Sequence, residues 1–411
     1  MRDSLLVESS SVSFASYPFS AIQQAFFTYA HHHQRPVAAW RLPHRSQQHI
    51  IADLSGSGQS PRLPLELLPA GFVAHPFRES APTAFIRADL HYVSGADTFA
   101  APYEAGEPHR AAGAAIEASL AAPSDAQPLT PYALPPTATQ PDTSRESFIR
   151  TVAEAVQTIE AGQFHKVVPS RQKTLALPSD FDLTTAFQQL CEAYPTAFVS
   201  VFSIPGVGTW LGASPETLVS TYQQAGRSMF RTMALAGTQA ARGQDALKNA
   251  TWRQKEIEEQ ALVSRYIINC FKHIRLREFE ENGPKTVAAG NLLHLRTDFT
   301  VDMEATNVPD LGSTMLALLH PTSAVCGMPK APALEFLRQH ESYDRSFFSG
   351  YLGPVNVEEE SHVFVNLRCM QLLQQRALLY AGAGVTADSE PEKEWEETEI
   401  KMNTLLHVIR K

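Results

Sequence analysis

The chain has 411 residues, of which 44% are hydrophobic and 19% charged, the composition of a globular protein with a large core. Its formal net charge of −9 provides no basic field to attract phosphates, so we expect no nucleic-acid partner. No apolar run reaches the length of a membrane span, the N-terminus lacks an apolar signal-peptide core and the four cysteines lack paired spacing, which together predict a cytoplasmic location, no membrane partner and free thiols.

The first third of the chain has few clear signals. It predicts a short helix near residues 21–29 and strands near 72–77 and 83–93. Residues 123–143 are rich in Pro, Thr, Ala and Ser, which predicts an irregular connection. We therefore divide the chain into three segments, with residues 1–122 before this connection and 144–411 after it.

The stretch from Phe164 to Lys173 predicts a strand that carries Lys166 among apolar residues. A buried lysine has a lowered pKa and can act as a general base. A lysine at the edge of a strand whose ammonium reaches water is the simpler alternative. Pro169, which lacks a backbone N–H, indicates an edge or a bulge close by.

The middle of the chain predicts a β-meander over residues 197–221 with glycine turns. Within it, Ser214-Pro-Glu216 is a turn that presents the Glu216 carboxylate at the end of a strand. A further strand from Phe230 runs into a turn at Gly237. A long helix over 251–273 places Glu256 and Glu259 on one face near its start.

The next elements add a histidine and an arginine in apolar surroundings. His294 lies in a predicted strand over 287–299, where a structural role is the more usual one. Strands over 347–355 and 362–370 predict a hairpin, and Arg368 in the second of them requires an anionic partner.

The C-terminal stretch predicts an apolar strand, a glycine turn at Gly382 and Gly384, and a helix opened by a capping box of Ser389 and Glu392. On that helix three side chains share one face, namely Glu394, Glu397 and Lys401. Two carboxylates, a lysine and a glycine turn suit a hard cation together with an anionic ligand. The alternative is a solvated acidic helix.

Several segments in this order resemble the chorismate-utilising enzymes over residues 140–411, and within that family the isochorismate synthases of menaquinone biosynthesis. The segments are Phe164-His-Lys-Val-Val-Pro-Ser-Arg, Gly212-Ala-Ser-Pro-Glu-Thr-Leu, Ala234-Leu-Ala-Gly-Thr, Lys255-Glu-Ile-Glu-Glu-Gln, His294-Leu, His320-Pro-Thr-Ser-Ala-Val-Cys-Gly-Met-Pro, Val365-Asn-Leu-Arg-Cys and Ala381-Gly-Ala-Gly with the helix that follows.

The resemblance implies an α/β (α+β) fold, a single large domain of two stacked, mostly antiparallel β-sheets flanked by helices. Residues 1–122 would be a divergent N-terminal part of this fold, and 144–411 the chorismate-binding catalytic part. The implied substrate is chorismate, the implied cofactor is Mg²⁺, and the implied state is a monomer.

The resemblance also implies roles for individual residues. Lys166 would be the general base that activates water, and Glu216 the general acid that protonates the leaving hydroxyl. Glu259 and Glu397 would bind Mg²⁺, with Glu256 and Glu394 beside the ion or its waters. The residues implied to bind substrate are Ala236, Gly237, Thr238, His294, Ala324, Phe348, Arg368, Gly382, Ala383, Gly384 and Lys401.

Single positions distinguish the members of the family. Enzymes that use ammonia typically have glutamine where this chain has Lys166, and aminodeoxychorismate synthases have a lysine where it has Ala236. Ala324 stands where salicylate and anthranilate synthases resemble each other in having threonine, and Phe348 stands where salicylate synthases tend to have tyrosine. We therefore expect an isochorismate synthase for menaquinone or siderophore biosynthesis, with salicylate synthase as the alternative. A non-catalytic chorismate-binding protein would be expected to lose Lys166, Glu216 or one of the metal-binding glutamates, and this chain keeps them all.

Overall fold

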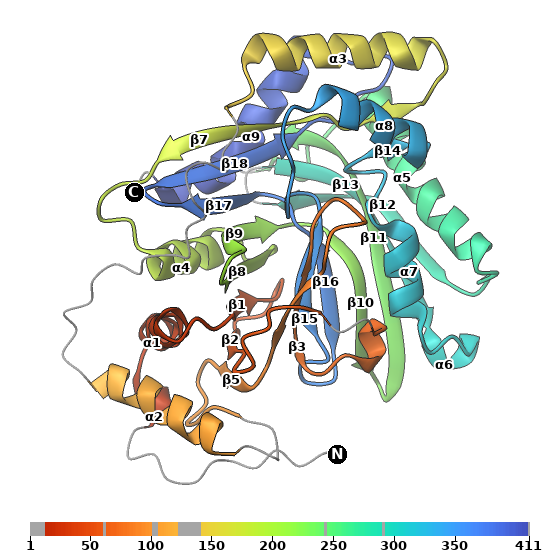
Figure 1. The fold of residues 1–411 in the computed structure, drawn as a ribbon. Helices are drawn as coiled ribbons and strands as arrows, with labels where there is room; N and C mark the ends of the chain where they lie inside the picture. The colour runs from red at the N-terminus through yellow and green to blue at the C-terminus, as the bar shows by residue number, and fades with distance from the viewer. Residues whose placement is uncertain are drawn as a thin grey trace.

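The computed structural model describes residues 13–60, 63–100, 106–121, 141–241, 245–289 and 292–409. Two eight-stranded sheets form its centre, and every pair of neighbouring strands in them is antiparallel (Figure 1). The predicted architecture of two stacked antiparallel sheets with flanking helices is confirmed.

The first sheet has the order β5 (Leu90–Val93), β2 (Gln48–Ala52), β1 (Val37–Arg41), β8 (Phe198–Ile204), β9 (Gly208–Ser214), β17 (Cys369–Leu373), β18 (Arg376–Gly382) and β7 (Ser170–Ala176). The second has the order β12 (Glu280–Ala289), β13 (Leu292–Asp302), β11 (Arg227–Ala240), β10 (Thr217–Gln224), β16 (Ser361–Val365), β15 (Tyr351–Val355), β3 (Gly71–His75) and β4 (Ala84–Arg87). A two-stranded ladder joins β6 (Lys166–Val167) to β14 (Gly327–Met328).

An aromatic core fills the space between the two sheets. It includes Trp40, Phe72, Phe202 and Trp210, and the rings of Phe198 and Phe364 stack with centroids 4.0 Å apart. Every residue of β8 and β9 is buried, because helices cover the outer face of the sheet whose inner face meets this core.

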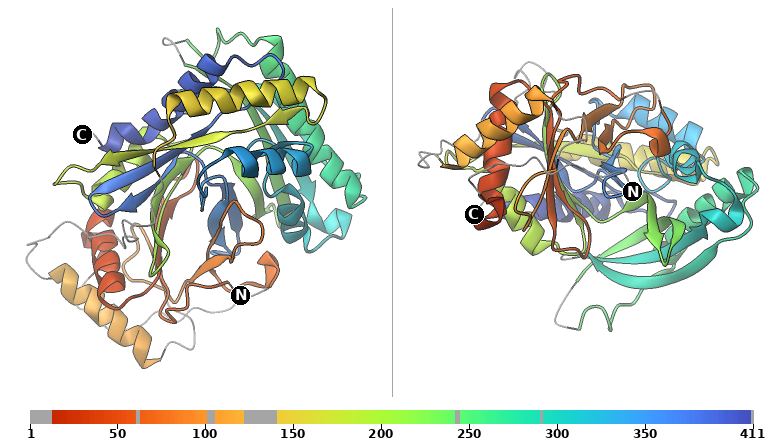
Figure 2. Two further views of the ribbon diagram at one scale, coloured as in Figure 1. Left: turned by 45° about the horizontal axis from the view of Figure 1, so that its top comes forward. Right: turned by 90° about the horizontal axis from the view of Figure 1, so that it is seen from below.

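Helices cover the outer faces of both sheets. The first sheet is covered by α1 (Phe19–His32), α4 (Leu183–Ala193) and α9 (Pro391–Ile409), and the second by α5 (Gln254–His273), α6 (Met303–Thr306) and α7 (Leu311–Leu319). The remaining helical elements are η1 (Phe14–Ser16), η2 (Leu65–Leu67), α2 (Glu107–Ala121) against α1, α3 (Arg145–Glu160) against α9, and α8 (Lys330–His340). Both views of Figure 2 show α1 and α2, in red and orange, on the opposite side of the molecule from α5. None of the described helices is long and apolar enough to cross a membrane.

The N-terminal segment contributes strands to both sheets. β1 pairs with β8 in the first sheet, and β3 pairs with β15 in the second. The segment is therefore built into the same sheets as the rest of the described chain. Most of the predicted connection, residues 123–140, lies outside the described residues, so the segment boundaries stay a prediction.

Four local predictions were wrong in detail. The predicted strand 164–173 is divided into β6 and β7, with Pro169 between them. Gly237 does not end a strand: it forms a bulge within β11, where the pairing register shifts between Ala236 and Thr238. Arg368 lies in the link between β16 and β17, with a left-handed φ of 49°, because the chain crosses there from the second sheet to the first. The Ser389 hydroxyl accepts a hydrogen bond from the Thr386 N–H (3.0 Å) in the turn before α9, which begins at Pro391.

Candidate active site

A cavity of about 70 Å³ lies where β11, β13, α5, α9 and the link after β16 converge. Thirteen of the residues predicted for the site line it: Glu216, Ala236, Gly237, Thr238, Glu259, His294, Ala324, Phe348, Arg368, Gly382, Gly384, Glu397 and Lys401. They come from nine separate stretches of the chain, so the fold brings together residues that are far apart in sequence.

Glu216 lies in the turn between β9 and β10, and its backbone carbonyl accepts a hydrogen bond from Val365 N–H (3.0 Å). The side chain is only 4% exposed and lines the cavity. Burial raises the pKa of Glu216 to about 8, although the charges of Lys166, Arg368 and Lys401 work in the opposite direction. At neutral pH the Glu216 carboxyl is therefore protonated and can donate a proton to a molecule in the cavity.

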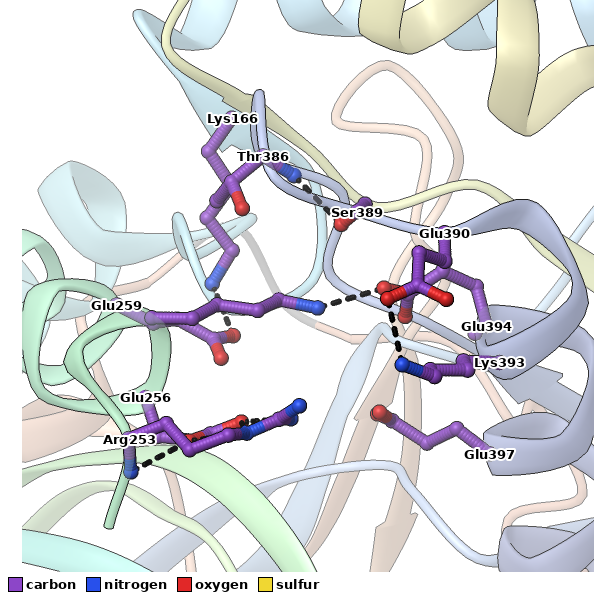
Figure 3. Close-up of polar contacts among 12 residues, drawn as sticks. Lys166, Arg253, Glu256, Glu259, Thr386, Ser389, Glu390, Lys393, Glu394 and Glu397 are labelled. Carbon is purple, nitrogen blue, oxygen red and sulfur yellow. Dashed lines mark hydrogen bonds and ion pairs between the residues drawn. The ribbon is translucent and has the colours of Figure 1, made fainter.

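Lys166 lies at the start of β6, is 1% exposed and does not itself line the cavity, but it contacts Glu259, which does. Its Nζ donates to Glu259 Oε1 at 2.7 Å (Figure 3). Gly384 faces this ion pair: a Cβ at that position would lie 2.7 Å from Glu259 Oε1 and 3.2 Å from Lys166 Cε. The glycine turn thus makes room for the lysine and the carboxylate, which is why a residue with a side chain does not fit there.

His294 on β13 is held by the bulge in β11. Its Nδ1 lies 3.0 Å from the carbonyl oxygen of Gly237, which can only accept a hydrogen bond, so Nδ1 carries the proton. Burial, together with the charge of Arg368, lowers the pKa of His294 to about 3 and keeps the ring neutral. Its Nε2 is buried without a hydrogen-bond partner among the described residues and is left as an acceptor. Gly237 itself has a left-handed φ of 66° and abuts Glu256, which explains the bulge at a glycine.

Arg368 and Lys401 supply positive charge to the cavity. Within the described part of the chain, the Arg368 side chain makes no hydrogen bond or ion pair. Burial lowers the pKa of Arg368 to about 10, and the negative charges of Glu397 and Glu216 partly oppose this shift. Lys401 donates to the carbonyl oxygen of Gly382 (2.8 Å) and pairs with Glu397 (2.6 Å). The unpaired guanidinium is therefore available to an anionic ligand.

A second, smaller cavity of about 60 Å³ shares Thr238, Glu259, Gly384 and Glu397 with the first. The two remaining predicted acids, Glu256 and Glu394, line it as well. Figure 3 shows the carboxylates of α5, Glu256 and Glu259, facing those of α9, Glu394 and Glu397.

Each of these carboxylates is paired with a basic side chain. Glu259 pairs with Lys166 and Glu397 with Lys401; Glu394 pairs with Lys255 at 2.6 Å, and Glu256 with Arg253 at 2.5 Å. Over the described residues, no group of three or more His, Cys, Asp or Glu side chains is arranged to hold a metal ion.

These four carboxylates, Glu256, Glu259, Glu394 and Glu397, which we call the acid cluster, nevertheless have the chemistry that a hard cation requires. All of its donors are carboxylate oxygens, the ligands that Mg²⁺ prefers. Glu394 is 1% exposed, and its Oε2 is buried with no hydrogen-bond partner among the described residues. Burial, and then repulsion by Glu397, raise the pKa of Glu394, so its carboxylate would gain from additional positive charge.

Ala383 is the one predicted substrate-binding residue that the structure places elsewhere. It is fully buried in a core cluster with Phe148 and Val152 of α3, because alternate residues of the Gly-Ala-Gly turn face opposite sides.

Sequence reasoning missed Arg345, which lines the cavity. Its guanidinium donates to Glu341, to the Val325 carbonyl (2.9 Å) and to the Val168 carbonyl (2.7 Å). It thereby ties the loop that carries Ala324 to the segment that carries Lys166. An arginine two residues before the apolar pair Phe347 and Phe348 was the signal available in the sequence.

A comparison with protein families finds that the model described as chorismate binding enzyme matches residues 104–410. Among curated proteins, isochorismate synthase EntC of Escherichia coli (strain K12) is 27% identical over 268 residues, which cover 64% of this chain and 67% of that protein. The salicylate biosynthesis isochorismate synthase of Pseudomonas aeruginosa is 33% identical over 279 residues, which cover 64% of this chain and 55% of that protein. The chain thus spans little more than half the length of this second relative.

Solved structures give the same picture of the fold. The menaquinone-specific isochorismate synthase MenF from Escherichia coli superimposes with a TM-score of 0.74 and 21% identity, covering 96% of this chain and 92% of that one. Anthranilate synthase component I from Streptococcus pneumoniae has a TM-score of 0.65 at 18% identity, covering 90% of each chain. At these identities the likeness establishes the shared fold alone.

Proposed function

Because the chain belongs to the chorismate binding enzymes, whose family model matches residues 104–410, we propose that it is an isochorismate synthase that converts chorismate to isochorismate with Mg²⁺. One observation carries the proposal: the same cavity is lined by a buried protonated carboxyl, Glu216, and by an arginine, Arg368, that has no partner among the described residues. The isochorismate synthases named above support the choice within the family.

Chorismate is a dianion, and the cavity offers groups for both of its carboxylates. The Arg368 guanidinium would bind one carboxylate with charge-assisted hydrogen bonds. Lys401, which already bonds to the Gly382 carbonyl, would contribute a second positive charge. Mg²⁺ would be held by Glu259 and Glu397, with Glu394 and Glu256 beside it, and when bound it supplies the positive charge that neutralises the other carboxylate.

The reaction requires a base and an acid. The Lys166 Nζ, as a neutral amine released from its ion pair with Glu259, would take a proton from the water whose oxygen bonds to C2. The ring double bonds shift, the C4–oxygen bond breaks, and Glu216 gives its proton to the departing hydroxyl, which leaves as water. The unprotonated Nε2 of His294 would accept a hydrogen bond from a substrate hydroxyl and fix the ring between the two groups.

A product analysis tests the proposal. The purified chain is incubated with chorismate and MgCl₂, with and without EDTA, and the products are separated by chromatography. We expect isochorismate, lost with EDTA and lost in Lys166→Ala. The matched control is Lys173→Ala, whose ammonium pairs with Glu399 outside the cavity and whose loss should leave turnover intact.

Other products would contradict the proposal in distinct ways. Salicylate with pyruvate would identify a salicylate synthase and show that Ala324 and Phe348 do not discriminate. Chorismate that binds but remains unchanged would identify a binding protein.

The pathway we propose is menaquinone biosynthesis, on the sequence resemblance, with siderophore biosynthesis as the alternative. Rescue of a strain that lacks its own isochorismate synthases would distinguish the two. Restored menaquinone without restored siderophore supports the first assignment.

A further inference from the structure

Lys255 lines the same small cavity as the acid cluster. Neither the sequence analysis nor the proposed reaction gives this lysine a role. It lies in the first turn of α5, and its Nζ donates to Glu394 Oε1 at 2.6 Å across the gap to α9. The side chain of Lys255 is 19% exposed, and that of Glu394 only 2%. The contact is thus a nearly buried ion pair between the two helices that carry the acids.

The surroundings of Lys255 are strongly negative. Burial alone would lower the pKa of Lys255, but the carboxylates of Glu394, Glu397 and Glu259 outweigh burial and raise it above its ordinary value. Three carboxylates therefore stabilise one ammonium group. They include the two acids, Glu259 and Glu397, that the proposed function assigns to Mg²⁺.

The other two lysines of the cluster already have roles in the proposed reaction. Lys166 pairs with Glu259, and Lys401 with Glu397. Lys255 is the third lysine paired with an acid of this cluster, and its partner Glu394 keeps a buried Oε2 without a described partner. A divalent cation among these carboxylates would meet the Lys255 ammonium at close range, and like charges repel strongly where water is excluded.

We propose that Lys255 is a positioning residue that acts as a built-in competitor of Mg²⁺. Its ammonium holds Glu394, and with it α9, against α5 when no divalent cation is bound. The same positive charge weakens the affinity of the cluster for Mg²⁺, so the cation is exchanged easily. The inference rests on the proposed function, because it concerns the cation that the proposed reaction uses.

Metal titration tests this directly. MgCl₂ is titrated calorimetrically into the wild-type chain and into Lys255→Met at constant ionic strength. We expect the Mg²⁺ dissociation constant to fall about tenfold or more in the variant, since a positive charge next to the site is removed. Lys255→Gln, which keeps a hydrogen-bond donor for Glu394 without the charge, should give the same tightening.

The matched control is Lys393→Met. Lys393 lines the same small cavity but pairs with Glu390 at its rim, and its side chain is 57% exposed. Water and salt screen a charge there, so its removal should change Mg²⁺ affinity by less than about threefold.

Thermal unfolding gives a second readout that does not depend on turnover. In EDTA we expect Lys255→Met to unfold at a lower temperature than the wild type, since Glu394 is left buried and unpaired. With MgCl₂ the difference should disappear. A variant that folds only with Mg²⁺ would support the proposal in the same way.

Two results would overturn the inference and can be told apart. If the wild type binds Mg²⁺ and both Lys255 variants bind it equally or more weakly, Lys255 supports the site instead of competing for it. If neither the wild type nor the variants bind Mg²⁺, the metal part of the proposed function fails, and this inference fails with it.

Discussion

Glu216 shows how burial sets the chemistry of a single side chain. It is 4% exposed, and its pKa is about 8, because burial disfavours the ionised form more than the nearby cations favour it. A carboxylic acid that keeps its proton at neutral pH can act as an acid, as the proposed reaction requires. Because the ionised carboxylate is unfavourable in this buried position, the protonation of Glu216 should affect both the rate of the reaction and the stability of the fold, and each can be measured.

The first expectation concerns activity. As pH rises through about 8, Glu216 loses the proton that the leaving hydroxyl needs, so kcat/KM should fall on the alkaline side. A series of steady-state rates from pH 6 to pH 10 at saturating MgCl₂ measures this. A rate that continues to rise to pH 10 would contradict the assignment of Glu216 as the acid.

The second expectation concerns stability. The folded-state pKa of Glu216 lies above its unfolded value, so its contribution to stability is fully present below pH 4.5 and is lost as pH rises through about 8. The loss is on the order of 5 kcal/mol at ~1.4 kcal/mol per pH unit. Glu216→Gln cannot ionise, so it should unfold at a higher temperature than the wild type at pH 8.5 and at a similar one at pH 5.

Thermal melts of both proteins at the two pH values check this expectation. Glu278→Gln, at an exposed position before β12, is the control and should leave both midpoints unchanged. Equal midpoints for Glu216→Gln and the wild type at pH 8.5 would show that the Glu216 carboxylate is solvated when ionised.

At the scale of elements, the site depends on the glycine turn between β18 and α9. Gly384 in this turn leaves room for Glu259 of α5 and Lys166 of β6 to approach α9. We expect Gly384→Ala to lose activity by about a hundredfold or more, because its Cβ would lie 2.7 Å from Glu259 Oε1 and displace the base or the metal-binding acid. Steady-state kinetics with chorismate measures the loss.

The control for this substitution is Gly106→Ala before α2, where the nearest atom to an added Cβ is 3.7 Å away. It should retain normal turnover. Wild-type activity in Gly384→Ala would mean that the Lys166–Glu259 pair can move without consequence for the reaction.

Helical spacing explains which parts of the site the sequence could predict. Glu394, Glu397 and Lys401 share a face of α9, and Glu256 and Glu259 share a face of α5, so the predicted helices already presented these side chains together. The resemblance to a family linked the two helices to Lys166, Glu216 and Arg368.

Long-range features were not predictable in the same way. The ion pairs Lys255–Glu394 and Lys166–Glu259 join residues that are more than ninety positions apart, and no local pattern encodes such contacts. The bulge at Gly237 and the left-handed Arg368 were mistaken for a turn and a strand, because local sequence does not show where a chain changes sheets or shifts register.

At the scale of the whole molecule, the N-terminal segment supplies interior strands. Without residues 1–122, β8 and β15 would become open edges, and the inter-sheet core around Phe198 and Phe364 would lose Trp40 and Phe72. We therefore expect residues 144–411 alone to show no cooperative thermal transition, although the family model matches most of them.

Circular dichroism melts and dye binding to exposed apolar surface measure this. Co-expression of residues 1–122 as a separate chain is the control and should restore the transition. Cooperative unfolding of 144–411 alone at the temperature of the intact chain would show that the segment is an accessory.

This interleaving of strands has a consequence for synthesis on the ribosome. β1 must wait for β8, more than 150 residues later, and β3 must wait for β15, more than 270 residues later. The first sheet also needs β17 and β18, which lie between β9 and β7, and the second needs β15 and β16, so neither sheet is complete until the last quarter of the chain has emerged. Such a high contact order favours slow folding and long exposure of apolar strands, and the nascent chain should therefore be a regular client of chaperones.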